Sequence, residues 1–240
     1  MSIRRTPMTL RKISAGLLLA GLVATPISAA ELTISISNLT HGNHFTPVLI
    51  AAHDAQMHLF QAGEPATSAL QKMAEGGDIA DLAAMVDGAS GVTLSNPAGG
   101  LMAPGQNVTS ISFDSQAMTH LSLVAMILPT NDAFIGLDGW EIPSTPGTYT
   151  LNLNAYDAGT EANDEVINGG GMPGVPGIPA APGSDGGSNA SGVADTSPND
   201  KVHIHPGILG DTDPAGGMSD LDSRVHRWLN PVARVTITVK

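Results

Sequence analysis

Residues Thr148–Ala155, which read Thr-Tyr-Thr-Leu-Asn-Leu-Asn-Ala, alternate polar and apolar side chains along their whole length. Threonine or asparagine occupies every even position, and the odd positions hold Tyr149, Leu151, Leu153 and Ala155. A period of two predicts a half-buried β-strand, because successive side chains of a strand point to opposite faces of its sheet. The stretch favours an antiparallel sheet with one face on the core and the other in water.

Five other segments predict strands on either side of this one. Three of them alternate or run apolar without a helical period: Leu32–Leu39, Val108–Phe113 and Leu121–Leu128. Phe45–Ala52 carries Pro47 near its start, which suits an edge or a bulge. Val232–Val239 is the closing strand, and we expect it beside the first. Together the segments predict a mainly β fold, an antiparallel β-sandwich.

Two short helices are expected between the early strands, packed against an end of the sandwich. Thr67 or Ser68 can cap the first helix, which ends at Gly76-Gly77, and Asp78 can start a second helix that runs to Val86. The following segment, Gly91–Gly105, is rich in Gly, Pro and Asn and predicts a loop.

Three carboxylates lie on two loops next to predicted strands. Asp132 follows the strand that ends at Leu128, and Asp157 and Glu161 follow the strand at Thr148–Ala155. Asp157 and Glu161 reach one ion only if the chain turns sharply between them, which Gly159 permits by tolerating a positive φ. Spacing alone leaves two interpretations open, a calcium site and a solvated acidic turn.

The first thirty residues have the three parts of an export signal. Four basic residues (Arg4, Arg5, Arg11 and Lys12) precede an apolar run at residues 13–23 and the small residues Ser28-Ala29-Ala30. We therefore expect residues 1–30 to be a signal peptide, cleaved after Ala30, and the mature chain to be exported, periplasmic or secreted. The apolar run is too short to span a bilayer comfortably, so no stable membrane insertion is expected.

The net charge and the cysteine content narrow the range of expected partners, cross-links and anchors. Removing the signal takes away four basic and no acidic residues, so the formal charge changes from −12 to −16. Such a field repels nucleic acid and anionic membrane surfaces, which makes both poor candidates as direct partners. The chain has no cysteine, so neither a disulfide nor a lipoprotein anchor is expected.

One domain, residues 31–240, is the most economical organisation for this length. It is interrupted by a segment at about residues 168–200 that is dominated by Gly, Pro, Ala and Ser. This insertion offers little apolar surface to offset the entropy of ordering, so we expect it to be peripheral and loosely extended.

Other sequence patterns suggest additional metal sites or a catalytic site. His203 and His205 would share one side of a strand and could bind zinc or copper, with His41, His44, His53 or His58 to complete the site; ordinary surface histidines are the alternative. Asp211-Thr212-Asp213 and Asp220-Leu221-Asp222 invite a second calcium site, or form a solvated acidic loop. No Gly-x-Ser-x-Gly motif of a serine hydrolase is present.

Five segments occur in an order that resembles the spondin domain family, across most of the mature chain. They are Phe45–Leu49, Ala69–Gly77, Leu128–Leu137, Asp157–Glu165 and Asn230–Ile237. The resemblance implies a β-sandwich of the type found in calcium-dependent membrane-binding modules, with one bound calcium near an edge and no catalytic activity. It also implies that the calcium ligands are Asp132, Asp157 and Glu161, the last replacing the aspartate of animal spondins.

The resemblance implies a function as well as a fold. We expect a non-enzymatic module for adhesion, or for binding an extracellular or envelope protein or glycan. Animal spondin domains are extracellular and commonly disulfide-bonded, so the absence of cysteine, with this signal, indicates a bacterial version. The alternative is a metal-dependent hydrolase of the cell envelope, which would need an open coordination position, a water molecule and a general base.

Overall fold

The structure is a computed structural model that describes residues 1, 30–183, 186–194 and 200–240. The predicted signal peptide falls almost wholly on residues 2–29, which lie outside the described residues. Two short helices and ten strands make up the fold: β1 (Glu31–Asn38), β2 (His44–Phe45), β3 (Leu49–His53), α1 (Ser68–Gly76), α2 (Ala80–Gly88), β4 (Val92–Ser95), β5 (Asn107–Asp114), β6 (His120–Leu128), β7 (Ala133–Glu141), β8 (Gly147–Asp157), β9 (His203–Ile204) and β10 (Ala233–Val239). Among the described residues, no helix is long and apolar enough to cross a membrane.

All strand pairs are antiparallel, in the order β4-β3-β6-β7-β8-β10-β1-β5. The short strands β2 and β9 pair with β6 and β8. β10 lies beside β1, with Ile237 opposite Ile34, as expected for the closing strand. The predicted mainly β, antiparallel fold with two short helices is confirmed. The sandwich takes the form of a continuous curved sheet, so its two halves share a strand.

That shared strand is β8, the stretch with the clearest alternation in the sequence. Its residues Gly147–Leu153 pair with β10, ending at Leu153 opposite Ala233. Its last four residues pair instead with β7, beginning with Asn154 opposite Gly136. Strands that change partners in this way form the corners where one layer passes into the other.

Two large apolar clusters account for most of the packing among the described residues. The main cluster lies inside the curved sheet and includes fully buried residues of β1, β6 and β10, such as Ile34, Leu123 and Ile237. The second cluster lies between the sheet and the helices, where Leu70, Met73 and Leu82 pack on Val124 and Phe134. β6 is therefore covered on both faces, which explains why its sequence is apolar without alternation.

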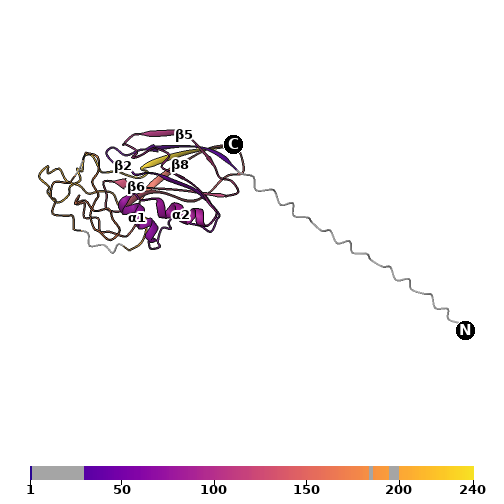
Figure 1. The fold of residues 1–240 in the computed structure, drawn as a ribbon, viewed down its shortest axis with the longest axis horizontal. Helices are drawn as coiled ribbons and strands as arrows, with labels where there is room; N and C mark the ends of the chain where they lie inside the picture. The colour runs from indigo at the N-terminus through magenta and orange to yellow at the C-terminus, as the bar shows by residue number, and fades with distance from the viewer. Residues whose placement is uncertain (2–29, 184–185, 195–199) are drawn as a thin grey trace.

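The helices begin and end largely where the sequence predicts. The side chain of Thr67 accepts a hydrogen bond from the main-chain N–H of Leu70 (3.1 Å), and Gly77 adopts a left-handed conformation at the end of α1. Asp78 accepts from the N–H of Ala80 (2.9 Å), and α2 begins at Ala80, two residues after Asp78. Both helices lie together on one side of the sheet (Figure 1).

The structure differs from the sequence prediction in three places. β4 lies inside the predicted loop Gly91–Gly105, and β7 was not predicted at all. In the insertion, Ile178 and Ala181 are buried, which differs from a loosely extended segment; residues 184–185 and 195–199 lie outside the described part. Ile178 packs with Ile167, Ile208 and Leu221 in a small separate cluster. The loops that carry this cluster lie at the end of the molecule far from the C-terminus (Figure 1).

Candidate metal centre

Asp132 and Asp157 meet at one end of the β7–β8 ladder. Asp157, the last residue of β8, pairs with Ala133, the first residue of β7. The main-chain carbonyl of Asp132 accepts a hydrogen bond from the N–H of Ala158 (3.3 Å). The antiparallel register thus brings together two carboxylates that are 25 positions apart in the sequence.

The turn after Asp157 depends on Gly159, as the sequence predicts. Gly159 has φ +71°, and a Cβ atom at this position would overlap the backbone of Lys201. Its N–H donates to Oδ1 of Asp157 (2.8 Å), and Oδ2 of Asp157 accepts from Nδ2 of Asn163 (2.7 Å). The turn directs the chain back toward Asp132.

Asp132 is fully buried and only partly satisfied. Its Oδ2 accepts from the N–H (2.8 Å) and hydroxyl (3.1 Å) of Thr160 and from the N–H of Glu161 (3.1 Å). Its Oδ1 is buried without a hydrogen-bond partner among the described residues. Burial and the nearby charge of Asp157 raise the pKa of Asp132 to about 7. A buried carboxylate in this state is stabilised either by a proton or by a cation.

The carboxylate of Glu161 points elsewhere. Its Oε2 accepts from the N–H of Gly177 (3.0 Å), in the insertion, and lies 3.4 Å from Nδ2 of Asn131. Burial raises the pKa of Glu161 to about 7, and the charges of Glu75 and Asp164 add to the shift. Within the described part of the chain, no three Asp, Glu or His side chains are grouped as a metal site. The structure thus brings Asp132 and Asp157 together and leaves the Glu161 carboxylate beside the insertion.

Two asparagines that the sequence analysis did not single out connect these loops. Asn131 donates to Asp164 (2.9 Å) and accepts from the N–H of Glu165 (3.2 Å). Asn163 donates to Asp157 and lies 3.3 Å from the ring of His205. Each asparagine directly precedes an aspartate, and this pairing is the only signal that the sequence offered.

The predicted histidine pair lies beside Asp157. His203 Nε2 lies 3.8 Å from Oδ2 of Asp157, and its ring is exposed. His205 is buried and accepts from the N–H of Gly207 (2.9 Å), and burial lowers its pKa to about 4. His53 and His58, two of the possible additional ligands, contact Ser122 and Asp138 instead. The zinc or copper hypothesis therefore gains no third ligand from the described residues.

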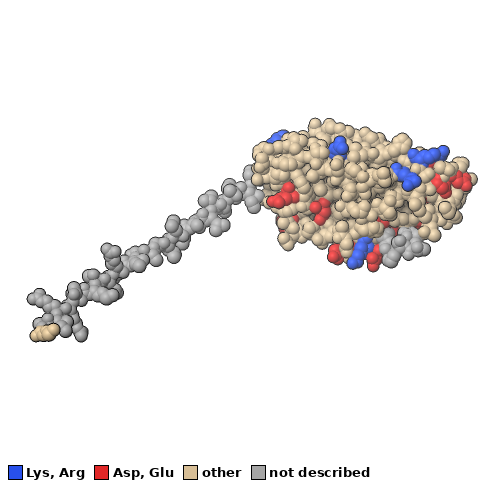
Figure 2. All heavy atoms as spheres, turned by 180° about the vertical axis from the view of Figure 1, so that it is seen from behind, with Lys and Arg blue, Asp and Glu red and all other residues tan. Residues whose placement is uncertain are grey.

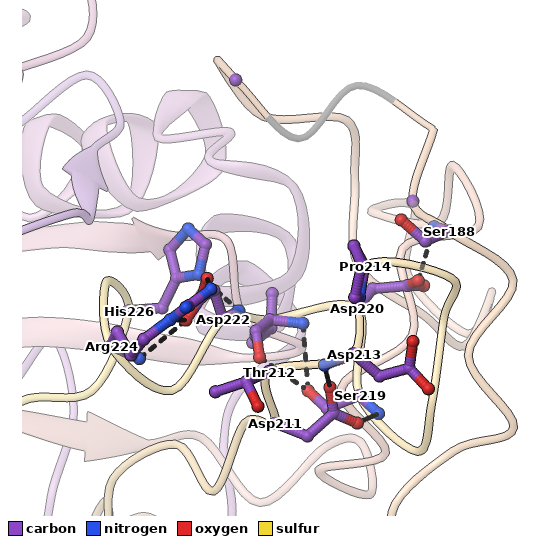
Figure 3. A pocket seen from close by; sticks show the side chains of 13 residues that line it. Ser188, Asp211, Thr212, Asp213, Pro214, Ser219, Asp220, Asp222, Arg224 and His226 are labelled. Atoms are coloured by element: carbon purple, nitrogen blue, oxygen red, sulfur yellow. Dashed lines mark hydrogen bonds and ion pairs between the residues drawn. The ribbon is translucent and has the colours of Figure 1, made fainter.

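The two other acidic segments, Asp211–Asp213 and Asp220–Asp222, help to line a pocket of about 300 Å³ (Figure 3). Asp211 accepts from the N–H groups of Asp213, Met218 and Ser219, and Asp220 accepts from three other main-chain N–H groups. Asp222 forms an ion pair with Arg224 (2.6 Å), which helps lower the pKa of Asp222 to about 2. These carboxylates organise the loops that carry them, and they do not converge on one point.

A serine–histidine pair is present but inaccessible. His53 Nε2 lies 2.7 Å from the hydroxyl of Ser122, and its Nδ1 lies 2.7 Å from the main-chain carbonyl of Asp54. Ser122 is 0% exposed and His53 is 1% exposed. Because nucleophilic catalysis requires that a substrate reach the hydroxyl, this pair serves to connect β3 and β6.

Comparison with known proteins identifies the family of the chain. No curated protein shows significant similarity to the chain. The family model for the spondin N-terminal domain, described as Spondin_N, matches residues 37–165, more than half of the chain. The match covers both site loops and ends at Glu165. Spondin N-terminal domains form an extracellular family that is not a known enzyme family. The chain belongs to the spondin N-terminal domain family.

Proposed function

We propose that the protein is an exported, non-enzymatic calcium-binding module for adhesion, or for binding an extracellular or envelope protein or glycan. Asp132 and Asp157 are the central calcium ligands of this proposal, and Glu161 is the third. The ion holds the two loops together and shapes the surface that they offer. Export is supported by the signal-like residues 1–30 and by the extracellular character of the family.

The buried oxygen Oδ1 of Asp132 carries the proposal. A carboxylate that has lost its water needs a compensating partner, and a second buried carboxylate nearby makes ionisation of both more costly. A divalent cation removes both costs at once. Calcium suits the site because it is a hard cation that prefers carboxylate and carbonyl oxygens.

Two carboxylates do not fill six to eight coordination positions, so further oxygens are required. Main-chain carbonyls and water are the ordinary sources. In this proposal Glu161 joins the set when its carboxylate leaves the N–H of Gly177. Each oxygen of Asp157 already accepts one hydrogen bond, and a carboxylate oxygen retains a second lone pair for a cation.

A metal-dependent hydrolase of the cell envelope is the alternative. Catalysis would require an open coordination position for water or substrate. Asp132 and Asp157 are both 0% exposed, which favours an ion enclosed by protein oxygens. A structural role for the ion therefore fits these two residues better than a catalytic role.

Calorimetry of residues 31–240 tests the proposal. After treatment with a chelator, the protein is titrated with calcium and its melting temperature is measured with and without the ion. We expect calcium to bind and to raise the melting temperature, because an ion that binds the folded state preferentially stabilises it by mass action. Asp132→Asn and Asp157→Ala should each remove most of that rise.

Asp213→Asn, in the other acidic loop, is the matched control and should keep the full rise. Magnesium distinguishes a calcium site from general screening of charge, because magnesium demands a more rigid octahedral site. The proposed site must be abandoned if calcium does not bind, or if Asp157→Ala responds to calcium as the wild type does.

A further inference from the structure

A pocket of about 310 Å³ opens on the outer face of the sheet, between β7 and β8. Its lining combines two aromatic rings with carboxylate and amide groups: Phe60, Gln61, Asp138, Asn152, Asn154 and Tyr156. This volume is at the small end of the range for ligand pockets. It differs from the candidate metal centre, because Tyr156 and Asp157 are neighbours on a strand and point to opposite faces.

The pocket results from the change of partners along β8. β7 and β8 pair only from Ala133–Gly136 to Asn154–Asp157. Before Asn154, β8 turns to β10, while β7 continues along β6. The strands separate at this point. The pocket therefore results from the register of β7 and β8.

Three aromatic rings hold the inner end of the pocket in place. Phe60 packs on Phe134 and Tyr156 with centroid distances of 5.0 and 4.9 Å, and Phe134 packs on Tyr156 at 5.6 Å. Gly136 makes room for this cluster, since a Cβ atom there would lie 2.5 Å from the ring of Phe60. Tyr156 is half-buried, so part of its ring is available to a ligand.

Some polar side chains of the pocket are held in place by hydrogen bonds, and others are available to bind a ligand. Asp138 is held by the N–H of Leu59 (2.9 Å) and by the ring of His58 (2.5 Å). Burial, together with the charge of Asp138, raises the pKa of Tyr156, so its hydroxyl stays protonated and can donate. The side chains of Gln61 and Asn154 and the hydroxyl of Tyr156 form no hydrogen bonds with other described residues, which leaves donors and acceptors for a ligand.

We propose that this pocket binds one pyranose ring of a neutral glycan. A sugar has hydroxyl groups at its edge and C–H groups on its faces, and it needs both polar partners and an aromatic surface. Asp138 and the formal charge of −16 expected for residues 31–240 disfavour acidic sugars. Charged side chains are also sparse on the face seen in Figure 2, as in the chain as a whole. The inference deepens the proposed binding function by naming a class of ligand.

The surface beside the pocket offers a path for a longer chain. Asn152, Thr150 and Thr148 continue the outward side of β8, and Thr150 and Thr148 lie opposite Thr236 and Thr238 of β10. The hydroxyls of Thr148 and Thr238 are 3.0 Å apart. This row of neutral hydrogen-bonding groups predicts that an oligosaccharide binds more tightly than a single sugar.

Nuclear magnetic resonance of isotope-labelled residues 31–240 tests the proposal. The probes are the methyl glycosides of glucose, galactose, mannose and N-acetylglucosamine, with maltotriose and laminaritriose as longer ligands and methyl glucuronide as the acidic comparison. We expect at least one neutral sugar to shift the side-chain amide signals of Gln61, Asn152 and Asn154. The matching trisaccharide should bind several-fold more tightly.

Variants identify the pocket as the source of the shifts. Tyr156→Phe should weaken binding a few-fold, and Asn154→Ala and Tyr156→Ala should weaken it by about ten-fold or more. Tyr149→Ala is the matched control: it removes the other tyrosine of β8, which does not line the pocket, and should leave binding unchanged. Asn154→Ala lies at a partly exposed position and keeps the test valid if Tyr156→Ala does not fold.

Two results would overturn the proposal: no shift with any neutral sugar, or undiminished binding in both Asn154→Ala and Tyr156→Ala. Repeating the titration with Asp132→Asn separates this site from the metal centre. Loss of calcium binding with sugar binding retained supports a glycan site that is separate from the metal centre, and loss of both would overturn that separation.

Discussion

One carboxylate oxygen of Asp132 accepts hydrogen bonds from both the N–H and the hydroxyl of Thr160, at 2.8 and 3.1 Å. The loop before β7 is therefore attached to the turn after β8 by two donors of a single residue. Thr160→Val keeps the shape of the side chain and removes one donor. We expect a loss of about 1 kcal/mol in the free energy of unfolding without calcium, measured by urea denaturation. Thr109→Val, on the exposed side of β5, should change it by less than about 0.5 kcal/mol.

Gly159 is predicted to be the least replaceable residue of the turn. Gly159→Ala combines a positive φ with overlap between the new Cβ and the backbone of Lys201, so we expect a loss of at least about 2 kcal/mol. Gly63→Ala is the matched control, because Gly63 has φ +90° but has no atom near the Cβ position. An equal loss in both variants would show that only φ matters at Gly159.

The stability of the calcium-free protein should depend on pH through Asp132 and Glu161. Both pKa values are raised to about 7, so the folded state holds protons that the unfolded state has released. Their contribution to stability is full below about pH 4 and is lost as the pH rises through 7. His205 acts in the opposite sense between about pH 4 and 6.5, because its pKa is lowered in the folded state.

Comparison of the wild type with Asp132→Asn separates these effects. The variant lacks the Asp132 titration, so its stability should fall less between pH 5 and 8, as measured by thermal unfolding with a chelator present. Saturating calcium should reduce the fall in the wild type, since the ion binds the ionised carboxylates. Identical pH profiles of the two proteins would contradict the raised pKa of Asp132.

Replacements at Glu161 test whether its carboxylate joins the ion. Glu161→Asp keeps the charge and restores the residue of animal spondins, so it should retain calcium binding. Glu161→Gln keeps the length and can still accept from the N–H of Gly177, but it should weaken calcium binding by about ten-fold or more. Calorimetric affinities decide the question, and equal affinity in the wild type and Glu161→Gln would remove Glu161 from the ligand set.

Glu165 is predicted to hold the long loop before β10. Its buried carboxylate accepts from the N–H groups of Leu209 (2.7 Å) and Gly210 (2.8 Å) and from the hydroxyl of Ser219 (2.6 Å). Glu165→Gln replaces one acceptor oxygen with a donor, so we expect a loss of about 2 kcal/mol and faster hydrogen exchange at Leu209 and Gly210. Glu64→Gln, at an exposed position, should show neither effect.

Local sequence patterns predicted the strands that have one face in water. Thr148–Ala155 lies within β8, and Leu32–Leu39 differs from β1 by one residue at each end. β7 escaped prediction because its first four residues are buried on both faces, which removes the alternation, and because it contains Gly136 and Gly139. The exchange of partners along β8 depends on long-range register, which periodicity does not report.

The candidate site shows the same division between local and distant causes. The sharp turn at Gly159 and the proximity of Asp132 to Asp157 follow from a glycine and from two strand ends. The direction of the Glu161 carboxylate depends on Gly177, a residue of the insertion, and no spacing rule connects the two. Calcium binding itself stays a prediction.

The position of β10 between β1 and β8 determines when the sheet can be completed during synthesis of the chain. Among the described strands, β10 is made after all the others, and it lies between β1, with its neighbour β5, and the rest of the sheet. Until residues 233–239 emerge, the β1–β5 pair has no ladder to the rest of the sheet, and much of the inner cluster stays open. The sheet of this domain therefore stays incomplete until residues 233–239 have been synthesised.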